Sequence, residues 1–163
     1  MKTLLLLRHG KSDWSGDHDA DHDRPLAPRG KKDARLIGEW VAKHGLEPQL
    51  VMTSTATRAR ETAERAADAG DWKAPIVTRR ELYLCPPRVV LDAVSEVDNE
   101  LGSVLVAGHE PTLSGAIELL SGARVEFVTA ALARIEVPVS SWRDLGLANG
   151  RLVFLLPPRL LRS

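Results

Sequence analysis

Short apolar runs alternate along this chain with longer segments in which apolar residues recur at helical spacing. The first run, Leu4–Leu7, stops at Arg8-His9-Gly10. A run of this length, apolar at every position, predicts the central strand of a parallel sheet, buried on both faces. The same reasoning predicts further strands over residues 50–53, 75–78, 103–107, 132–137 and 151–156.

The segments between these strands have the pattern of amphipathic helices. In residues 28–44, Ala34, Ile37, Trp40 and Val41 recur at helical spacing, and Gly45 supplies a stop signal. Further helices are predicted over residues 55–69, 88–97 and 111–120. Strands and helices that alternate in this way predict an α/β fold, with three α/β/α layers and a mostly parallel central sheet.

Composition limits the class of protein. The 163 residues fit one domain, and 44% hydrophobic residues suffice for a core. The 22 basic and 22 acidic residues balance, which does not favour nucleic acid as a partner. Cys85 is the one cysteine of the chain and cannot form an internal disulfide, so a reducing cytoplasm is expected. The first apolar run is too short for a signal peptide, and no run approaches the ~20 residues of a membrane span.

Candidate chemistry gathers at three strand ends. Arg8 and His9 follow the first strand, residues 53–62 with Arg58 follow the second, and His109 follows the strand that ends near residue 107. The carboxyl ends of parallel strands meet at one crevice, and helix N-termini there favour anions. Any one of these pieces alone is ordinary, since hydroxyl residues cap helices and arginines are usually solvated. Together, two arginines and two histidines predict a site for a phosphoryl group.

Two other features have simpler explanations. The Asp17–Asp23 stretch is rich in residue types that bind metals, but its short spacings in a loop define no coordination geometry. We therefore predict a solvated loop near the site and no metal. Cys85 lacks an activating neighbour in sequence and is predicted to be a packing residue.

These motifs resemble a known family. Arg8-His9-Gly10, Arg58-Ala59-x-x-Thr62 and Gly108-His109 are similar to the motifs of the histidine phosphatase superfamily, which has a phosphoglycerate mutase-like fold. The resemblance is closer to its SixA-like phosphohistidine phosphatase branch and spans nearly the whole chain, as one domain over residues 1–163. It rests on Lys11-Ser12, Asp23-Arg24-Pro25-Leu26, Ser54-Thr55-Ala56, His109-Glu110-Pro111 and Pro157-Pro158-Arg159.

The resemblance implies a covalent mechanism without metal or other cofactor. His9 would take the phosphoryl group, and water would then release inorganic phosphate. Arg8, Arg58 and His109 would clamp the phosphoryl oxygens, His109 as an imidazolium. Glu81 falls where larger family members carry a proton-donating carboxylate, but it also fits an exposed glutamate between two arginines. Both interpretations of Glu81 stay open.

The substrate is inferred from chain length. Between Thr62 and His109 there is no room for a large lid insertion over a small sugar phosphate. An open, shallow pocket favours phosphohistidine displayed on another protein, of the histidine phosphotransfer domain type. The alternatives are a broad phosphomonoesterase for small molecules and a non-catalytic phosphate-binding module. A mutase is least expected, because it must hold its intermediate away from water.

Overall fold

The fold is built on one six-stranded sheet. The computed structural model describes residues 1–17 and 19–163. The strand order is β3 (Ile76–Thr78), β2 (Leu50–Thr53), β4 (Ser103–Gly108), β1 (Lys2–Arg8), β5 (Leu132–Val137) and β6 (Arg151–Leu156). The first four strands in this order are parallel to one another, whereas β5 is antiparallel to both of its neighbours. The prediction of a mostly parallel sheet is confirmed.

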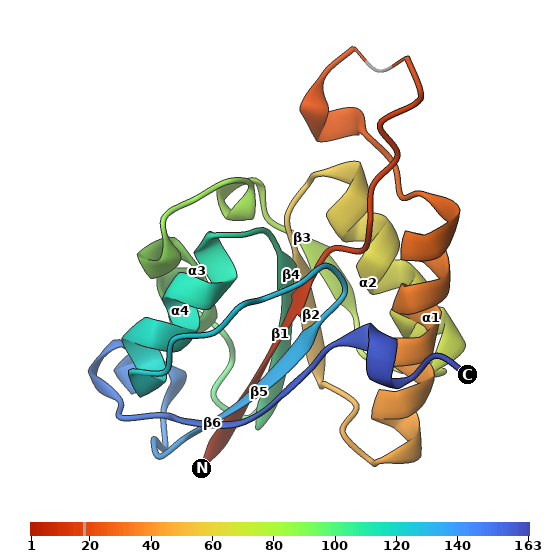
Figure 1. The fold of residues 1–163 in the computed structure, drawn as a ribbon. Helices are drawn as coiled ribbons and strands as arrows, with labels where there is room; N and C mark the ends of the chain where they lie inside the picture. The colour runs from red at the N-terminus through yellow and green to blue at the C-terminus, as the bar shows by residue number, and fades with distance from the viewer. Residues whose placement is uncertain (18) are drawn as a thin grey trace.

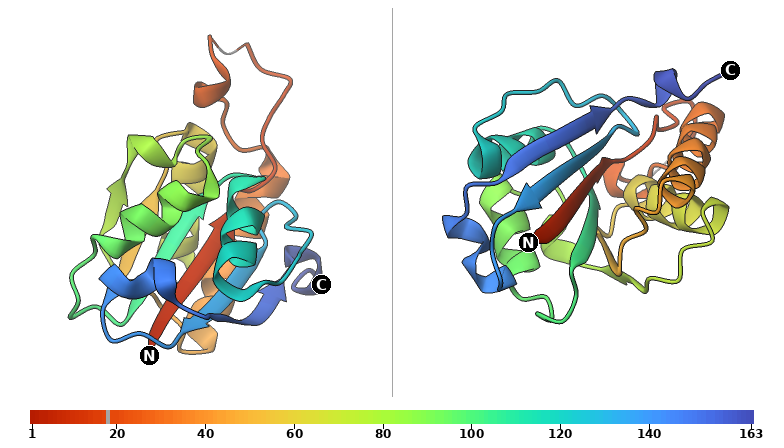
Figure 2. Two further views of the ribbon diagram at one scale, coloured as in Figure 1. Left: turned by 90° about the vertical axis from the view of Figure 1, so that its left-hand side faces the viewer. Right: turned by 90° about the horizontal axis from the view of Figure 1, so that it is seen from below.

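Helices cover both faces of the sheet (Figures 1 and 2). Helices α1 (Pro28–Lys43) and α2 (Thr57–Ala69) lie on one face, and α3 (Pro87–Ser95) and α4 (Thr112–Ser121) lie on the other. Leu5 and Leu7 pack with α1 and α2, whereas Leu4 and Leu6 pack with α3 and α4. Side chains alternate between the faces of a strand, so a strand covered on both faces is apolar at every position. Burial of β1 on both faces explains why Leu4–Leu7 is apolar at every position. The helices on both faces of the sheet confirm the predicted three layers.

Regular elements begin and end close to the predicted positions, but short turns were not predicted. The second helix begins at Thr57, two residues later than expected. Residues 21–23, 80–82, 142–147 and 158–160 form 3₁₀ segments. Such short turns show little periodicity in a sequence. No helix in the described parts of the chain is long and apolar enough to cross a lipid bilayer.

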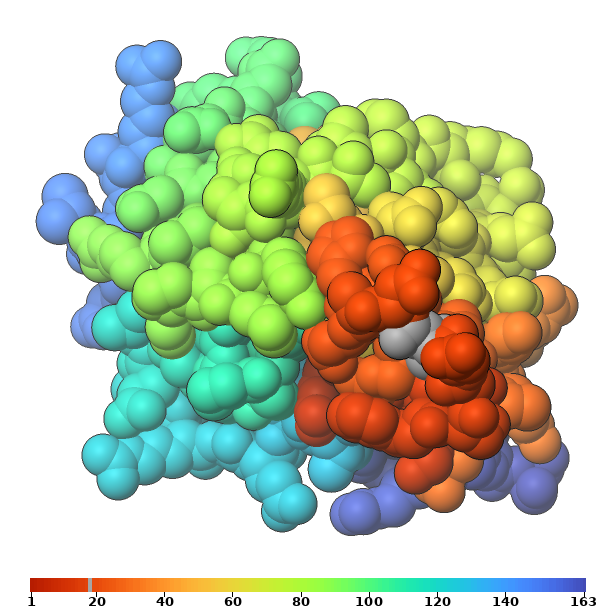
Figure 3. Space-filling model, turned by 90° about the horizontal axis from the view of Figure 1, so that it is seen from above, coloured from red at the N-terminus to blue at the C-terminus, as the bar shows by residue number. Residues whose placement is uncertain are grey.

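The segment between β1 and α1 crosses the carboxyl edge of the sheet. Its described residues, 11–17 and 19–27, lie across the middle of the face seen in Figure 3. The two arms of the segment are joined where Asp13 N donates to Pro25 O at 2.8 Å, beside a β-bridge between Ser12 and Leu26. Between α2 and β4 there is no large insertion, as predicted. The segment between β1 and α1 covers this edge of the sheet instead.

Candidate active site

The two histidines of the predicted site lie at neighbouring strand ends. Arg8, the last residue of β1, is in register with Gly108, the last residue of β4. His9 N donates to Gly108 O at 3.1 Å, and the rings of His9 and His109 are 5.3 Å apart between centroids. The next strand, β2, leads into helix α2, whose first turn carries Arg58. The predicted meeting of three strand ends is therefore observed.

Backbone contacts fix the ring of His9. Its Nδ1 lies 2.7 Å from Gly10 O, which can only accept, so Nδ1 carries the ring hydrogen and Nε2 keeps the lone pair. The N–H of Gly10 donates to Thr62 Oγ1 at 2.9 Å, and that hydroxyl donates to Arg58 O at 2.7 Å. Helix α2 thus holds the peptide that orients His9, and Nε2 is the nitrogen that can attack.

The surroundings of His9 keep it neutral. Burial, the largest cause, acts together with the nearby charges of Arg58, Arg8 and Arg24 and against the Gly10 hydrogen bond, and the net effect lowers the pKa of His9 to about 4. A group that is protonated only in acid retains its nucleophilic lone pair at neutral pH. The site therefore supplies a neutral, oriented imidazole without a separate base.

A pH profile tests this assignment. We expect the acid limb of kcat/KM to lie near pH 4, well below the ordinary histidine pKa of 6.5, because kcat/KM reports the free enzyme. Initial rates on a substrate that does not titrate in this range measure it. A limb near pH 6.5 would contradict the buried, neutral state of His9.

Stability must be followed in the same experiment. A histidine whose pKa is depressed by folding binds its proton more readily in the unfolded chain, so the free energy of unfolding falls as pH drops below about 6.5. His9 and His109 both act in this direction. Circular dichroism at each pH separates unfolding from titration of His9.

Burial also favours the neutral form of His109, whereas the resemblance implies an imidazolium. It is 1% exposed, and burial, with the nearby charges of His9 and Arg58, lowers the pKa of His109 to about 3. Its Nε2 lies 2.7 Å from Ser54 Oγ. When Nε2 accepts from that hydroxyl, which itself accepts from Ala56 N at 3.3 Å, the ring hydrogen of His109 lies on Nδ1. A neutral His109 can thus donate a hydrogen bond through Nδ1.

Several buried nitrogens around His9 have no hydrogen-bond partner among the described residues. They are Arg8 Nε, Arg24 Nε, Arg58 Nε and His109 Nδ1. Other atoms of these side chains are fixed, as where Arg8 Nη1 donates to Phe127 O at 2.8 Å. An unpartnered buried donor costs free energy, so a cluster of four requires an explanation. An anion with several oxygens would satisfy them together.

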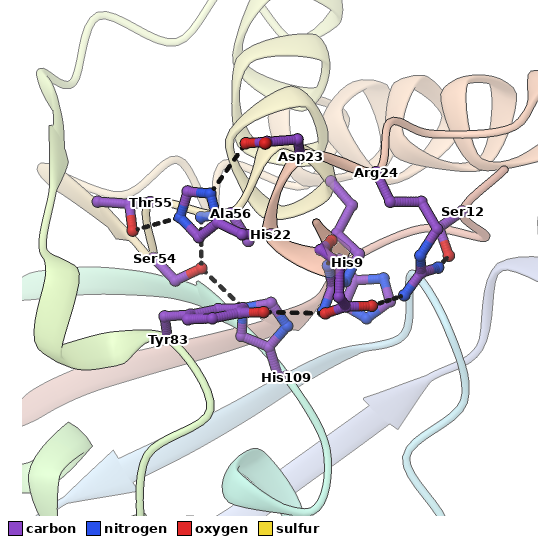
Figure 4. A network of polar contacts seen from close by, with 12 residues as sticks. His9, Ser12, His22, Asp23, Arg24, Ser54, Thr55, Ala56, Tyr83 and His109 are labelled. Atoms are coloured by element: carbon purple, nitrogen blue, oxygen red, sulfur yellow. Dashed lines mark hydrogen bonds and ion pairs between the residues drawn. The ribbon is translucent and has the colours of Figure 1, made fainter. Parts of the chain in front are cut away.

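Three residues to which the sequence analysis assigned no role in the site complete it. Asp21, Arg24 and Tyr83 come from two separate segments, and Figure 4 shows Arg24 and Tyr83 on either side of His9. The carboxylate of Asp21 accepts from Arg24 Nη2 at 2.7 Å, Arg58 Nη2 at 3.1 Å and Tyr83 Oη at 2.9 Å. These donors, the Arg24 guanidinium first, hold the pKa of Asp21 well below its usual range. The i,i+3 spacing of Asp21 and Arg24 was a signal for part of this network.

This finding changes the view of the Asp17–Asp23 stretch. His18 lies outside the described residues. His22 Nε2 lies 2.8 Å from Thr55 Oγ1, and Asp21 bridges three side chains of the site. The stretch is therefore not merely a solvated loop.

Glu81 does not join the cluster. It is exposed, and its Oε1 accepts from Arg79 Nε at 2.7 Å, while Arg79 Nη2 donates to Glu96 at 2.9 Å. A hydrogen bond from its own backbone and the Arg79 guanidinium lower the pKa of the Glu81 carboxyl. Its role as proton donor stays a prediction. Cys85, in contrast, packs against the core beneath α3 and α4, and burial raises the pKa of its thiol.

The site is more enclosed than the open, shallow pocket we expected. His9 is 8% exposed, Arg58 3% and His109 1%. The cover is the loop between β1 and α1, which brings Asp21 over the histidines. The contacts of Asp21 with Arg58 and Tyr83 join residues far apart in the chain, so no local pattern in the sequence predicted them.

The site and the fold define a class of protein. The family model of the histidine phosphatase superfamily (branch 1) matches residues 4–83. The chain belongs to this superfamily, in its SixA-like branch.

Similar proteins extend over nearly the whole chain. An uncharacterized protein of Mycobacterium leprae is 33% identical, over 94% of this chain and 100% of its own. A proposed phosphohistidine phosphatase SixA from Nakamurella multipartitia is 30% identical, covers 96% of each chain and has a TM-score of 0.82. The protein histidine phosphatase SixA complexed with tungstate is 26% identical, covers 98% of this chain and 99% of its own, and has a TM-score of 0.85.

Proposed function

We propose that this protein is a metal-independent phosphatase that hydrolyses phosphohistidine on another protein through a phosphohistidine intermediate on His9. One observation carries the proposal: four unpartnered buried nitrogens, on Arg8, Arg24, Arg58 and His109, belong to side chains that lie near an oriented, neutral imidazole. Positioning and charge stabilisation account for most of phosphoryl-transfer catalysis. This arrangement offers both.

The reaction has two steps. Nε2 of His9 attacks phosphorus, a new P–N bond forms, and the P–N bond of the substrate breaks as its imidazole leaves with the electron pair and takes a proton from solvent water. Water then attacks the phosphorus of phosphorylated His9, whose P–N bond breaks to regenerate the neutral ring and inorganic phosphate. In both steps Arg8, Arg58 and His109 donate hydrogen bonds to the phosphoryl oxygens, where negative charge must be stabilised.

The leaving group favours phosphohistidine over phosphate esters. An alkoxide leaving group needs a proton donor, which typically contributes 10²–10⁴-fold. Glu81 is ion-paired with Arg79 outside the cluster, and the carboxylate of Asp21 holds no proton to give. Imidazole leaves readily from its weak P–N bond and depends less on an acid. The structural likeness to SixA proteins supports the same substrate class.

Substrate preference tests the proposal. We expect the wild-type protein to release phosphate from a phosphorylated histidine phosphotransfer domain with a kcat/KM about 10²-fold or more above that for any small phosphomonoester, the factor an absent general acid would give. Phosphate release from both substrate types measures it. Glu81→Gln should leave phosphohistidine hydrolysis within about twofold, since the P–N bond needs little acid assistance.

The other outcomes are equally informative. A preference for small esters that Glu81→Gln abolishes would establish a phosphomonoesterase with Glu81 as its acid. Phosphate binding without release from any substrate would establish a non-catalytic binding module.

A further inference from the structure

The carboxylate of Asp21 occupies donors that the proposed function needs for the phosphoryl group. Both terminal nitrogens of Arg58 are bound to Asp21: Nη1 to its backbone oxygen at 2.9 Å and Nη2 to its carboxylate at 3.1 Å. The same carboxylate accepts from Arg24 Nη2 and from Tyr83 Oη. A carboxylate and a phosphoryl group both accept the planar fork of an arginine. The two would therefore compete for Arg58.

The competing carboxylate lies close to the reacting histidines. Tyr83, which donates to Asp21, packs edge-on against His109 with 5.5 Å between ring centroids. The charge of Asp21 also acts on the pKa of His109 in the raising direction, as a nearby anion must. Asp21 thus brings a negative charge to the place where a phosphoryl group has to arrive.

Two cavities flank this contact at the surface. One, of about 340 Å³, is lined by Trp14, Asp21 and Arg24 among others. The second, of about 510 Å³, is lined by His22, Thr55, Arg80 and Tyr83. Asp21 lines the first and Tyr83 the second, and the two are hydrogen-bonded to each other. The hydrogen bond between Asp21 and Tyr83 separates these two cavities. If the Asp21 side chain were displaced, this separation would open.

We propose that Asp21 is an affinity-determining residue, an internal carboxylate that the incoming phosphoryl group displaces from Arg58 and Arg24. This inference rests on the proposed function, because it assumes that the phosphoryl group binds these arginines. The exchange is feasible because the side chain of Asp21 is 46% exposed whereas that of Arg58 is 4% exposed, so the carboxylate can move into solvent while the guanidinium stays in place. A phosphoryl group brings more charge and three acceptor oxygens to the same donors.

The exchange explains how such a site could prefer a phosphoprotein. Free phosphate has only its contacts with the arginines and histidines to displace Asp21. A phosphorylated protein adds surface contacts around the site, and these contacts offset the same displacement cost, so it can bind at concentrations at which free phosphate does not. After hydrolysis, return of Asp21 to Arg58 would favour release of the small product.

Binding of tungstate and inorganic phosphate tests the inference without any catalytic step. Calorimetry on the wild type, Asp21→Asn and the matched control Asp23→Asn gives the dissociation constants. Asp23 is in the same loop, its side chain is 61% exposed, and its carboxylate lies 3.3 Å from His22, so its replacement removes the same charge without touching the arginines. We expect Asp21→Asn to bind both anions about tenfold more tightly, about 1.4 kcal/mol, and Asp23→Asn to bind within about twofold of wild type.

Each result has a defined meaning. Unchanged or weaker anion binding by Asp21→Asn would overturn the inference and make Asp21 a positioning residue that holds Arg24 and Arg58 for the substrate. No binding by any of the three proteins would overturn the proposed function and the inference with it.

A second variant guards against a folding defect in Asp21→Asn. Tyr83→Phe removes one donor to Asp21 and leaves every charge in place. Like Asp21→Asn, it should bind tungstate more tightly than the wild type, by about twofold to threefold, because the half-exposed carboxylate loses one hydrogen bond. Trp14, stacked over the Arg24 guanidinium at 3.6 Å, lies where its fluorescence can report the displacement. Weaker binding by Tyr83→Phe would contradict the inference.

Discussion

His9→Ala is expected to reduce phosphate release by about 10⁴-fold or more, since the loss of a covalent nucleophile removes the entire two-step route. The reason lies in the geometry: Nδ1 is committed to Gly10 O, and Nε2 is the ring atom left to form the bond to phosphorus. Phosphate release by the purified variant from a phosphohistidine protein measures the effect. Wild-type protein should also take up an acid-labile, base-stable phosphoryl label that His9→Ala does not.

A matched histidine elsewhere controls for the substitution itself. His44 is exposed at the end of α1, where it stacks on Trp40, and His44→Ala should retain wild-type activity and labelling. Label retained by His9→Ala would show that another residue is the nucleophile. Release that persists at near wild-type rate in His9→Ala would contradict the covalent mechanism altogether.

Local patterns in the sequence predicted the elements of the fold because local physics determines them. Leu4–Leu7 is apolar at every position since both faces of β1 are covered, and the helical spacing in Pro28–His44 matches the single buried face of α1. The carboxyl ends of β1, β2 and β4 then had to meet at one edge of the sheet. Arg8, His9, Arg58 and His109 could be placed together on that basis.

The contacts of the loop over the site could not be predicted in this way. Asp21 meets Arg58 and Tyr83 across 37 and 62 positions of the chain, and no periodicity connects residues so far apart. The neutral state of His109 also depends on burial, which only the packed structure reveals. Glu81 is the opposite case. Its position in the sequence fits the family pattern of a proton donor, but Arg79 holds its side chain at the surface.

A specific glycine contact illustrates how the fold serves the nucleophile. A Cβ on Gly10 would lie 2.8 Å from Gly30 O, so the peptide after His9 packs directly against the first turn of α1. Only glycine permits this approach, and it places Gly10 O where it orients the His9 ring. In the proposed mechanism, Arg8 would clamp the phosphoryl group and His9 would attack it, while the backbone of Gly10 orients the His9 ring.

Arg58→Ala is expected to lower kcat/KM for phosphohistidine by about 10²–10³-fold, the loss typical of removing a preorganised charge-stabilising donor. Arg58 is 3% exposed, and its guanidinium presents an unpartnered Nε and also Nη2, which by our inference the Asp21 carboxylate releases to the substrate. Arg58→Lys should recover only part of the activity, because a lysine keeps the charge but not the planar fork. Steady-state kinetics and tungstate affinity measure both variants.

The control for this prediction lies on the same helix. Arg65, paired with Glu61 further along α2, can be replaced by alanine without reaching the site, and Arg65→Ala should keep wild-type kinetics. If Arg58 served only to hold the loop through Asp21, Asp21→Asn would lose activity to the same extent as Arg58→Ala. If Arg58 binds the phosphoryl group, the two variants diverge: Arg58→Ala binds tungstate more weakly, whereas Asp21→Asn binds it more tightly. This opposition in sign separates a phosphate clamp from a structural ion pair.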